Sequence, residues 1–191
     1  MTETTRTVEQ ALSPSLALRV AVAVVAGAVL VALGAQAAVP IPGTPVPITL
    51  QVPAVLIVGG LLGPSLGASS LVFYLMLGAT GLPVFAPGGL PGVARLFGPT
   101  GGYLLAYPLA AAIAGLGVTA GRRWGRLAAA FVAGTLMIHV GGVAQLAVLG
   151  GDPATAWRLG SLPFLLGDFA KLLFAGLIVG RFAAPVRRAL P

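Results

Sequence analysis

The chain has 191 residues, of which 58% are hydrophobic and only 8% are charged. Its mean hydropathy is +1.02. A soluble globular domain typically carries about 25% charged residues, so this composition excludes that class and indicates a chain that is solvated by lipid. Cysteine is absent, which excludes disulfides, thiolate nucleophiles and cysteine-ligated metals. The formal net charge is +7, but the basic residues lie between apolar runs instead of on one soluble face, which favours membrane orientation over nucleic-acid binding.

The apolar runs and the proline and glycine loops between them predict an all-α integral membrane protein with a single membrane domain over residues 1–191. Four prolines between residues 39 and 47 cannot lie inside a helix, because each lacks an N–H and clashes with the preceding turn. A second loop, rich in glycine and proline, covers residues 82–100. The sequence therefore predicts six transmembrane helices, at about residues 16–38, 48–63, 66–81, 101–120, 127–149 and 162–182.

The distribution of the basic residues predicts the orientation of these helices. With six spans and a cytoplasmic N-terminus, eight basic residues fall inside, namely Arg6, Arg19, Arg122, Arg123, Arg126, Arg181, Arg187 and Arg188. Only Arg95 and Arg158 fall outside, and Lys171 lies within the last helix. Cytoplasmic loops carry the excess of Lys and Arg, so we expect both termini to be cytoplasmic.

Asp168 and Lys171 are the most informative polar residues, because both lie in the last apolar segment. Ionisable side chains in a span cost about 2.5–3.5 kcal/mol each on insertion scales and usually face an internal cavity. Their i, i+3 spacing places them on one helix face. The functional interpretation is a polar patch in a ligand pocket, and the alternative is an ion pair that serves only folding.

Two further residues have open roles. Arg95 lies in the long outward loop, where it either extends to the lipid headgroups or holds a carboxylate at the mouth of a pocket. His139 is the only histidine. With no cysteine and no neighbouring carboxylate it makes a poor metal ligand, so we expect no metal site. An interhelical hydrogen bond is favoured for His139, with a proton relay as the alternative.

Neutral polar residues near the outward helix ends are candidate cavity liners, each of which could instead make an interhelical bond: Gln36, Thr49, Gln51, Tyr74 and Tyr103. The run from Gly98 to Gly102 lacks the Gly-Lys-Ser/Thr ending of a P-loop, so no nucleotide site is expected. A serine, histidine and acid arrangement is not expected either, because the only acids are Glu3, Glu9, Asp152 and Asp168. The chain is therefore not predicted to be an enzyme and needs no cofactor.

The first helix carries small residues at four-residue spacing, in the pairs Ala17/Ala21, Ala23/Gly27 and Ala28/Ala32. Such faces let helices approach closely. They serve either packing within the chain or docking of a partner membrane protein.

Four sequence motifs, in this order, resemble those of the BioY family. They are VPIPGTPVPITLQ at 39–51, preceded by Gly-Ala-Gln at 34–36, then LVFYLMLGATGLPVFA at 71–86, LFGPTGGY at 96–103 and LPFLLGDFAK at 162–171. The last contains a Gly-Asp-x-x-Lys motif that matches position by position at Asp168 and Lys171. The resemblance extends from about Leu16 to Arg181.

The resemblance implies a biotin-binding S component of an energy-coupling factor (ECF) transporter, with the six-helix S-component fold and a location in a prokaryotic cytoplasmic membrane. Biotin is the transported ligand, and the partners are a transmembrane coupling protein (T component) and two ABC ATPases. Some members work alone or as dimers. The implied docking face is the small-residue face of the first helix, at Ala23, Gly27, Ala28 and Ala32. The expected pose puts the ureido ring of biotin at Asp168 and its carboxylate at Arg95 or Lys171, with Gln51, Tyr74 and Tyr103 as further liners.

Three rival hypotheses remain. The chain is an S component for another small vitamin, an intramembrane enzyme, or a scaffold in which Asp168 and Lys171 merely pair.

Overall fold

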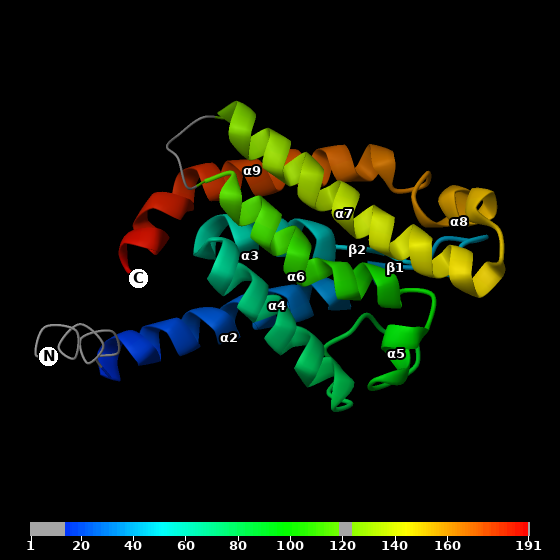
Figure 1. Ribbon diagram of the computed structural model, residues 1–191, viewed down its shortest axis with the longest axis horizontal. Coiled ribbons are helices and arrows are strands. Elements are labelled where there is room, and N and C mark those ends of the chain that lie inside the picture. The colour runs from blue at the N-terminus through cyan, green and yellow to red at the C-terminus, as the bar shows by residue number, and fades with distance from the viewer. Residues whose placement is uncertain (1–13, 119–123, 191) are drawn as a thin grey trace, which may run out of the picture.

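The computed structural model describes residues 14–118 and 124–190, which form one helical bundle. Figure 1 shows the long helices packed side by side, with a small hairpin and two short helices at one end. The elements in chain order are α2 (Pro14–Gln36), β1 (Ala38–Val39), β2 (Ile48–Thr49), α3 (Gln51–Leu62), α4 (Pro64–Ala79), α5 (Ala94–Phe97), α6 (Gly101–Leu116), α7 (Trp124–Gly150), α8 (Pro153–Gly160) and α9 (Leu165–Arg188).

A helix overlaps each of the six predicted ranges, but the helices differ in length. Three of them in the described part of the chain, α2, α7 and α9, are long and apolar enough to cross a membrane. The helices α3, α4 and α6 are apolar but have only 12, 16 and 16 residues, fewer than the roughly 20 residues that a full span takes. The count of six spans therefore stays a prediction.

The shortest of these helices, α3, is the most buried one. Nine of its 12 residues are buried, and it packs against α2, α4, α6 and α9. Pro53 is tolerated because it lies in the first turn, where backbone N–H groups have no partner inside the helix. Gly63 ends the helix with a φ of 88°, a conformation that favours glycine. Since neighbouring helices cover α3, it does not need the length of a lipid-facing span.

The four-proline loop forms a hairpin instead of extending the flanking helices. α2 ends at Gln36 and α3 begins at Gln51, so the predicted bounds of 38 and 48 were too generous. Between them β1 and β2 pair antiparallel, with Ala38 opposite Thr49 and Val39 opposite Ile48. The loop is thereby held across the end of the bundle that also carries α5 and α8 (Figure 1).

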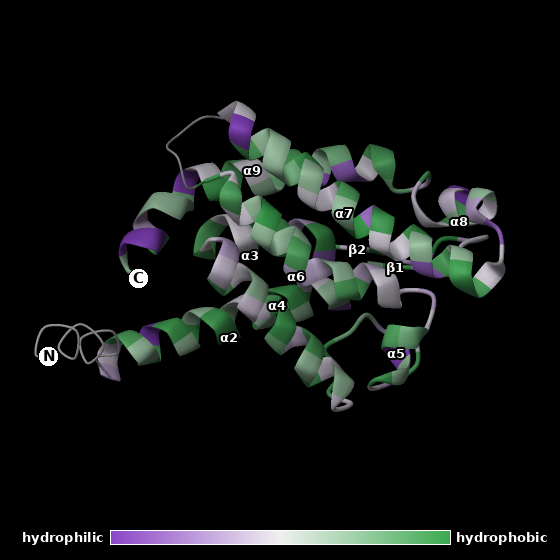
Figure 2. Ribbon diagram, in the orientation of Figure 1, coloured by the Kyte–Doolittle hydropathy of each residue, from purple (hydrophilic) through white to green (hydrophobic). Residues whose placement is uncertain are grey.

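Two short helices lie where only loops were predicted. The first, α5, divides the glycine and proline loop of residues 82–100. The second, α8, begins after Asp152, whose carboxylate accepts hydrogen bonds from the backbone N–H groups of Ala154 and Thr155. Pro153 follows at the first helical position, a favourable place for proline. Figure 2 shows hydrophilic residues on α8 and near the beginning of α7 and the end of α9, with hydrophobic colouring between.

Glycines allow the helices to approach one another closely. A Cβ atom at Gly59 of α3 would lie 2.1 Å from the carbonyl oxygen of Ala111 in α6. A Cβ at Gly102 of α6 would lie 2.1 Å from the carbonyl oxygen of Gly141 in α7. These separations exclude any side chain, so the two glycines set the spacing of α6 from its neighbours.

The small-residue face of α2 is used largely within the chain, which corrects part of the predicted docking face. Ala28 is 1% exposed and belongs to the main hydrophobic core, and Ala32 packs against that core. A Cβ at Gly27 would lie 2.6 Å from Ser70 Oγ in α4. Of the four residues, Ala28 and Ala32 therefore serve packing in this structure, whereas Ala23 and Gly27 border an apolar groove.

Candidate functional site

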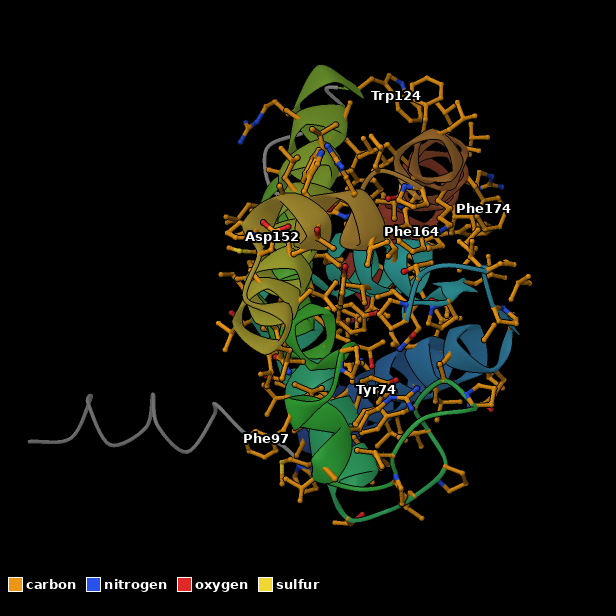
Figure 3. All side chains as sticks on the ribbon, turned by 90° about the vertical axis from the view of Figure 1, so that its right-hand side faces the viewer. Tyr74, Phe97, Trp124, Asp152, Phe164 and Phe174 are labelled. Atoms are coloured by element: carbon orange, nitrogen blue, oxygen red, sulfur yellow. The ribbon has the colours of Figure 1, made fainter. Side chains whose placement is uncertain are left out.

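A pocket lies at the end of the bundle that carries the hairpin, α5 and α8. It is enclosed by residues of the hairpin, the loop after α4 and the helices α3, α5, α6, α7 and α9. Viewed from this end, Figure 3 shows Phe97 and Phe174 at the periphery, whereas Tyr74 and Phe164 lie between the helices. Its charged and polar lining residues are Thr49, Gln51, Arg95, Thr100, Tyr103, Tyr107, His139, Asp168 and Lys171.

Asp168 is the centre of a charged cluster in this pocket. Its side chain comes from the first turn of α9 and is only 4% exposed. Lys171 Nζ lies 3.1 Å from Asp168 Oδ1, and His139 Nε2 lies 2.8 Å from Asp168 Oδ2. The predicted pair is therefore present, and each carboxylate oxygen has one partner. Because His139 lies on α7 and Asp168 on α9, this contact is the interhelical hydrogen bond that the sequence analysis favoured.

A serine completes this chain of hydrogen bonds, contrary to the sequence analysis. Ser161 Oγ lies 2.9 Å from His139 Nδ1, so a serine, a histidine and an acid are joined after all. The sequence analysis missed this because Ser161 is in the turn between α8 and α9, far along the chain from His139 in α7. Ser161 is 0% exposed and is not among the pocket residues, so its hydroxyl cannot act as a nucleophile on a bound ligand.

Arg95 also lines the pocket, but unlike Lys171 it has no acidic partner among the described residues. It is 6% exposed, and one guanidinium nitrogen, Nη2, donates to the carbonyl oxygen of Ala86. Its Nε atom is buried and has no hydrogen-bond partner. Burial lowers the pKa of the Arg95 guanidinium, but arginine remains charged in proteins. A buried cation with a free donor is suited to holding an anionic group.

Gln51 lines the pocket, whereas Tyr74 stands behind it. Gln51 Nε2 donates to the Tyr74 hydroxyl at 2.9 Å, and that hydroxyl donates to the carbonyl oxygen of Val84 at 3.1 Å. Tyr74 is fully buried and also packs edge-on against Phe85, with ring centroids 5.4 Å apart. Tyr74 is therefore not a liner, which corrects the prediction. It holds Gln51 and the loop after α4 in place.

Of the remaining predicted liners, two line the pocket and one does not. Thr49 and Tyr103 line the pocket, and the Tyr103 hydroxyl also donates to the carbonyl oxygen of Gly160 at 2.6 Å. Gln36 does not line it, because its amide donates to carbonyl oxygens of Ala32, Pro83 and Phe85. The sequence analysis missed Tyr107, which follows Tyr103 by one helical turn and lines the same pocket.

The described residues contain no group of three histidine, cysteine or acidic side chains that could hold a metal ion. The charged side chains that line the pocket include one carboxylate with two partners, Asp168, and one guanidinium without an acidic partner among the described residues, Arg95.

Comparison with known proteins identifies the family of this chain. The model of the BioY family matches residues 4–188. The chain belongs to the BioY family. Similar relatives include a probable biotin transporter BioY from Pyrococcus horikoshii, 44% identical over 80% of this chain and 88% of the relative. The biotin transporter BioY from Thermotoga maritima is 39% identical over 80% and 88% of the two chains.

A solved structure has the same fold. The crystal structure of the S-component for biotin from an ECF-type ABC transporter superposes with a TM-score of 0.80 and 27% sequence identity. The match covers 90% of this chain and 94% of that one. The chain therefore has the S-component fold, and the resemblance drawn from the motifs is confirmed.

Proposed function

We propose that this BioY-family chain is the substrate-binding S component of an ECF transporter and captures biotin for uptake across the cytoplasmic membrane of a prokaryote. The observation that carries the proposal is the pocket itself, which is lined by both the Asp168 carboxylate and the Arg95 guanidinium, whose Nε atom has no hydrogen-bond partner. Biotin has N–H donors at its ureido ring and a carboxylate at the end of an apolar chain. Apolar walls with a few placed polar groups are typical of a small-molecule site.

The two basic residues differ, and this difference supports one orientation of biotin. Lys171 already neutralises Asp168, whereas Arg95 has no carboxylate partner within the described residues. The carboxylate of biotin therefore goes to Arg95, and an N–H group of the ureido ring goes to Asp168. Gln51 and Tyr103 line the same pocket, and no cofactor is needed.

The topology that we propose has six spans and two cytoplasmic termini. The beginning of α2 and the end of α9 lie at the same end of the bundle, away from the pocket, as an even number of crossings requires (Figure 1). Arg19, Arg181 and Arg188 lie in the parts of α2 and α9 nearest that end, and Arg95 and Arg158 lie in the short helices at the pocket end. This distribution agrees with a cytoplasmic end that carries the excess of positive charge.

The partners that we propose are a T component and two ABC ATPases. The sequence contains no P-loop motif, so the energy for transport has to come from other chains. An apolar groove near the termini is bordered by α2, α3 and α9, including Ala23, Gly27 and Leu30 of α2. A helix of the T component fits this groove, because its walls are apolar and the small residues permit close approach. A homodimer is the alternative where the chain works without such partners.

A binding titration tests the proposal. Purified protein in nanodiscs should bind biotin saturably, and unlabelled competing vitamins should not displace it. Asp168→Asn should weaken binding by more than tenfold, which is about 1.4 kcal/mol, because the variant loses an ionised acceptor. Asp152→Asn is the matched control, since Asp152 is exposed on α8. Absence of saturable binding refutes the function, and displacement by another vitamin favours that vitamin as the ligand.

A further inference from the structure

A chain of hydrogen bonds joins Ser161, His139 and Asp168. These are the residue types of a hydrolytic triad, but the positions of the serine and the acid relative to the pocket are exchanged. Ser161 Oγ contacts His139 Nδ1 at 2.9 Å, and His139 Nε2 contacts Asp168 Oδ2 at 2.8 Å. In a hydrolase the hydroxyl faces the substrate and the acid is buried behind the imidazole. In this structure the acid and the imidazole line the pocket, whereas the hydroxyl is fully buried. The end of the chain that a ligand can reach is therefore the carboxylate.

Elementary hydrogen-bond chemistry fixes the direction of the donors along this chain. An ionised carboxylate only accepts, so Nε2 of His139 carries the hydrogen that is donated to Asp168. Lys171 supplies one positive charge to Asp168, so a neutral imidazole leaves the cluster without net charge. Charge neutrality is favoured in this apolar setting, where an uncompensated buried charge is costly. Nδ1 is then an acceptor and receives the hydroxyl hydrogen of Ser161.

The hydroxyl is itself held by the turn in which Ser161 lies. The Ser161 backbone N–H donates to the carbonyl oxygen of Trp157 in α8, and the Ser161 carbonyl accepts from the N–H of Phe164. The preceding carbonyl, that of Gly160, accepts from the Tyr103 hydroxyl. The turn is thus tied to α8 on one side and α6 on the other, so the imidazole has a fixed partner behind it.

We propose that Ser161 and His139 are positioning residues that set the orientation of the Asp168 carboxylate for an N–H donor of the ligand. This inference rests on the proposed function and deepens it. Lys171 holds Oδ1 and His139 holds Oδ2, while each oxygen keeps a further lone pair for a ligand. Asp168 selects the imidazole tautomer that donates to it, and Ser161 holds the imidazole in place by donating to Nδ1. The carboxylate is therefore oriented before the ligand arrives, which lowers the entropic cost of binding.

The first test needs no ligand, because His139 is the only histidine and its imidazole nitrogens give a single set of NMR signals. Nitrogen-15 spectra of the ligand-free protein in nanodiscs should show the neutral tautomer with hydrogen on Nε2. Ser161→Ala should shift the Nδ1 signal, since Nδ1 loses the hydrogen bond from the Ser161 hydroxyl. A signal from the Nδ1–H tautomer in the native protein, or an unchanged spectrum in Ser161→Ala, overturns the proposal.

The second test is the biotin dissociation constant of variants at His139. His139→Leu should raise it by about tenfold, because Asp168 loses a charge-assisted partner. His139→Gln should restore most of the affinity, since its terminal amide nitrogen can still donate to Asp168. Thr135→Val is the matched control, because Thr135 lies one turn earlier on α7 and its buried hydroxyl has no hydrogen-bond partner. It should leave both the affinity and the imidazole signals unchanged.

The outcomes separate this inference from the proposed function. If the native protein does not bind biotin, the proposed function fails, and the imidazole signals of native and Ser161→Ala protein still decide the positioning role. If biotin binds but His139→Leu has native affinity, or His139→Gln is as weak as His139→Leu, the positioning role fails alone. Thermal unfolding of the ligand-free variants identifies any that are misfolded. Native affinity in a folded His139→Leu protein is the clearest contradiction.

Discussion

The two ends of the bundle are held together by different physical means. At the pocket end, side chains donate to backbone carbonyl oxygens of loops and short helices, in the bonds Thr44 to Leu159, Arg95 to Ala86, Tyr103 to Gly160, and Gln145 to Leu96 and Gly98. At the termini end, the helices contact each other through glycines and through apolar side chains such as Leu56, Phe131 and Val179. The main polar exception at the termini end is Arg187, which donates to the carbonyl oxygens of Gly60 and Gly115.

The difference follows from what each end contains. Loops have no helical ladder of hydrogen bonds, and a buried carbonyl without a partner is costly, so side chains must supply the missing donors. Two of these side chains, Arg95 and Tyr103, also line the pocket. The termini end consists of helices that satisfy their own backbones, so it needs only close packing. Hydrogen-bonded loops and close apolar packing are thus separated along one bundle.

The largest effect is expected from disturbing the close packing at Gly59. Gly59→Ala places a Cβ 2.1 Å from the carbonyl oxygen of Ala111, so α3 and α6 must separate. We expect a loss of about 3 kcal/mol in the free energy of unfolding, the upper part of the usual range for overpacking. Gly176→Ala is the control, because no atom lies within 4 Å of its added Cβ. Equal stability of the two variants in detergent unfolding would refute the packing argument.

The next effect concerns the pocket end and the unpaired guanidinium. Arg95→Met should raise the biotin dissociation constant by about a hundredfold, since hydrogen bonds to charged groups contribute about 1.5–3 kcal/mol. Biotinamide, which has no carboxylate, should bind the variant and the native protein alike. Arg95→Lys should fall between them, because it keeps the charge and loses the planar fork. A similar loss for biotin and biotinamide would place the carboxylate elsewhere.

The contrast between the two ends also explains what the sequence could predict. Asp168 and Lys171 stand out because charge is rare in an apolar segment, and their spacing alone places them on one helix face. The helix ranges follow from prolines and glycines, whose effects are local. Asp152 followed by Pro153 is a helix start signal that was present in the sequence but was not used to predict α8.

Features that depend on how helices cross could not be predicted in this way. His139 and Asp168 are 29 positions apart and meet only because α7 packs beside α9. Tyr74 has the character of a liner, but its hydroxyl turns to Gln51 and Val84. Ala28 and Ala23 belong to the same small-residue pattern, yet the packing of α2 against α3 and α4 buries Ala28 and leaves Ala23 beside the groove.

A smaller and more selective effect is expected in the apolar groove at the termini end. Ala23→Trp fills the groove, so it should reduce the amount of T component that copurifies and should lower uptake in cells. The biotin dissociation constant should be unchanged, because the pocket lies at the other end. Ala21→Trp is the control, since Ala21 is exposed on the same helix and does not border the groove. Copurification that is equal in both variants would remove the groove from the docking surface.

The smallest effect is expected at α8, where acid should weaken the helix start without altering the packing of the bundle. Hydrogen bonds from Thr155 and then from the backbone of Ala154 hold the pKa of the Asp152 carboxyl below its ordinary value of 3.8. Because the pKa is lower in the folded state, this capping contributes stability above pH 3.8 and is lost as pH falls through the lowered pKa. Trp157 in α8 reports the change by its fluorescence when Trp124 is replaced by Phe. Asp152→Asn keeps a capping oxygen but does not titrate, so the acid transition should be absent in this variant. If the transition is identical in Asp152→Asn, it belongs to another group. The nearest acidic residue along the chain is Asp168 at the pocket.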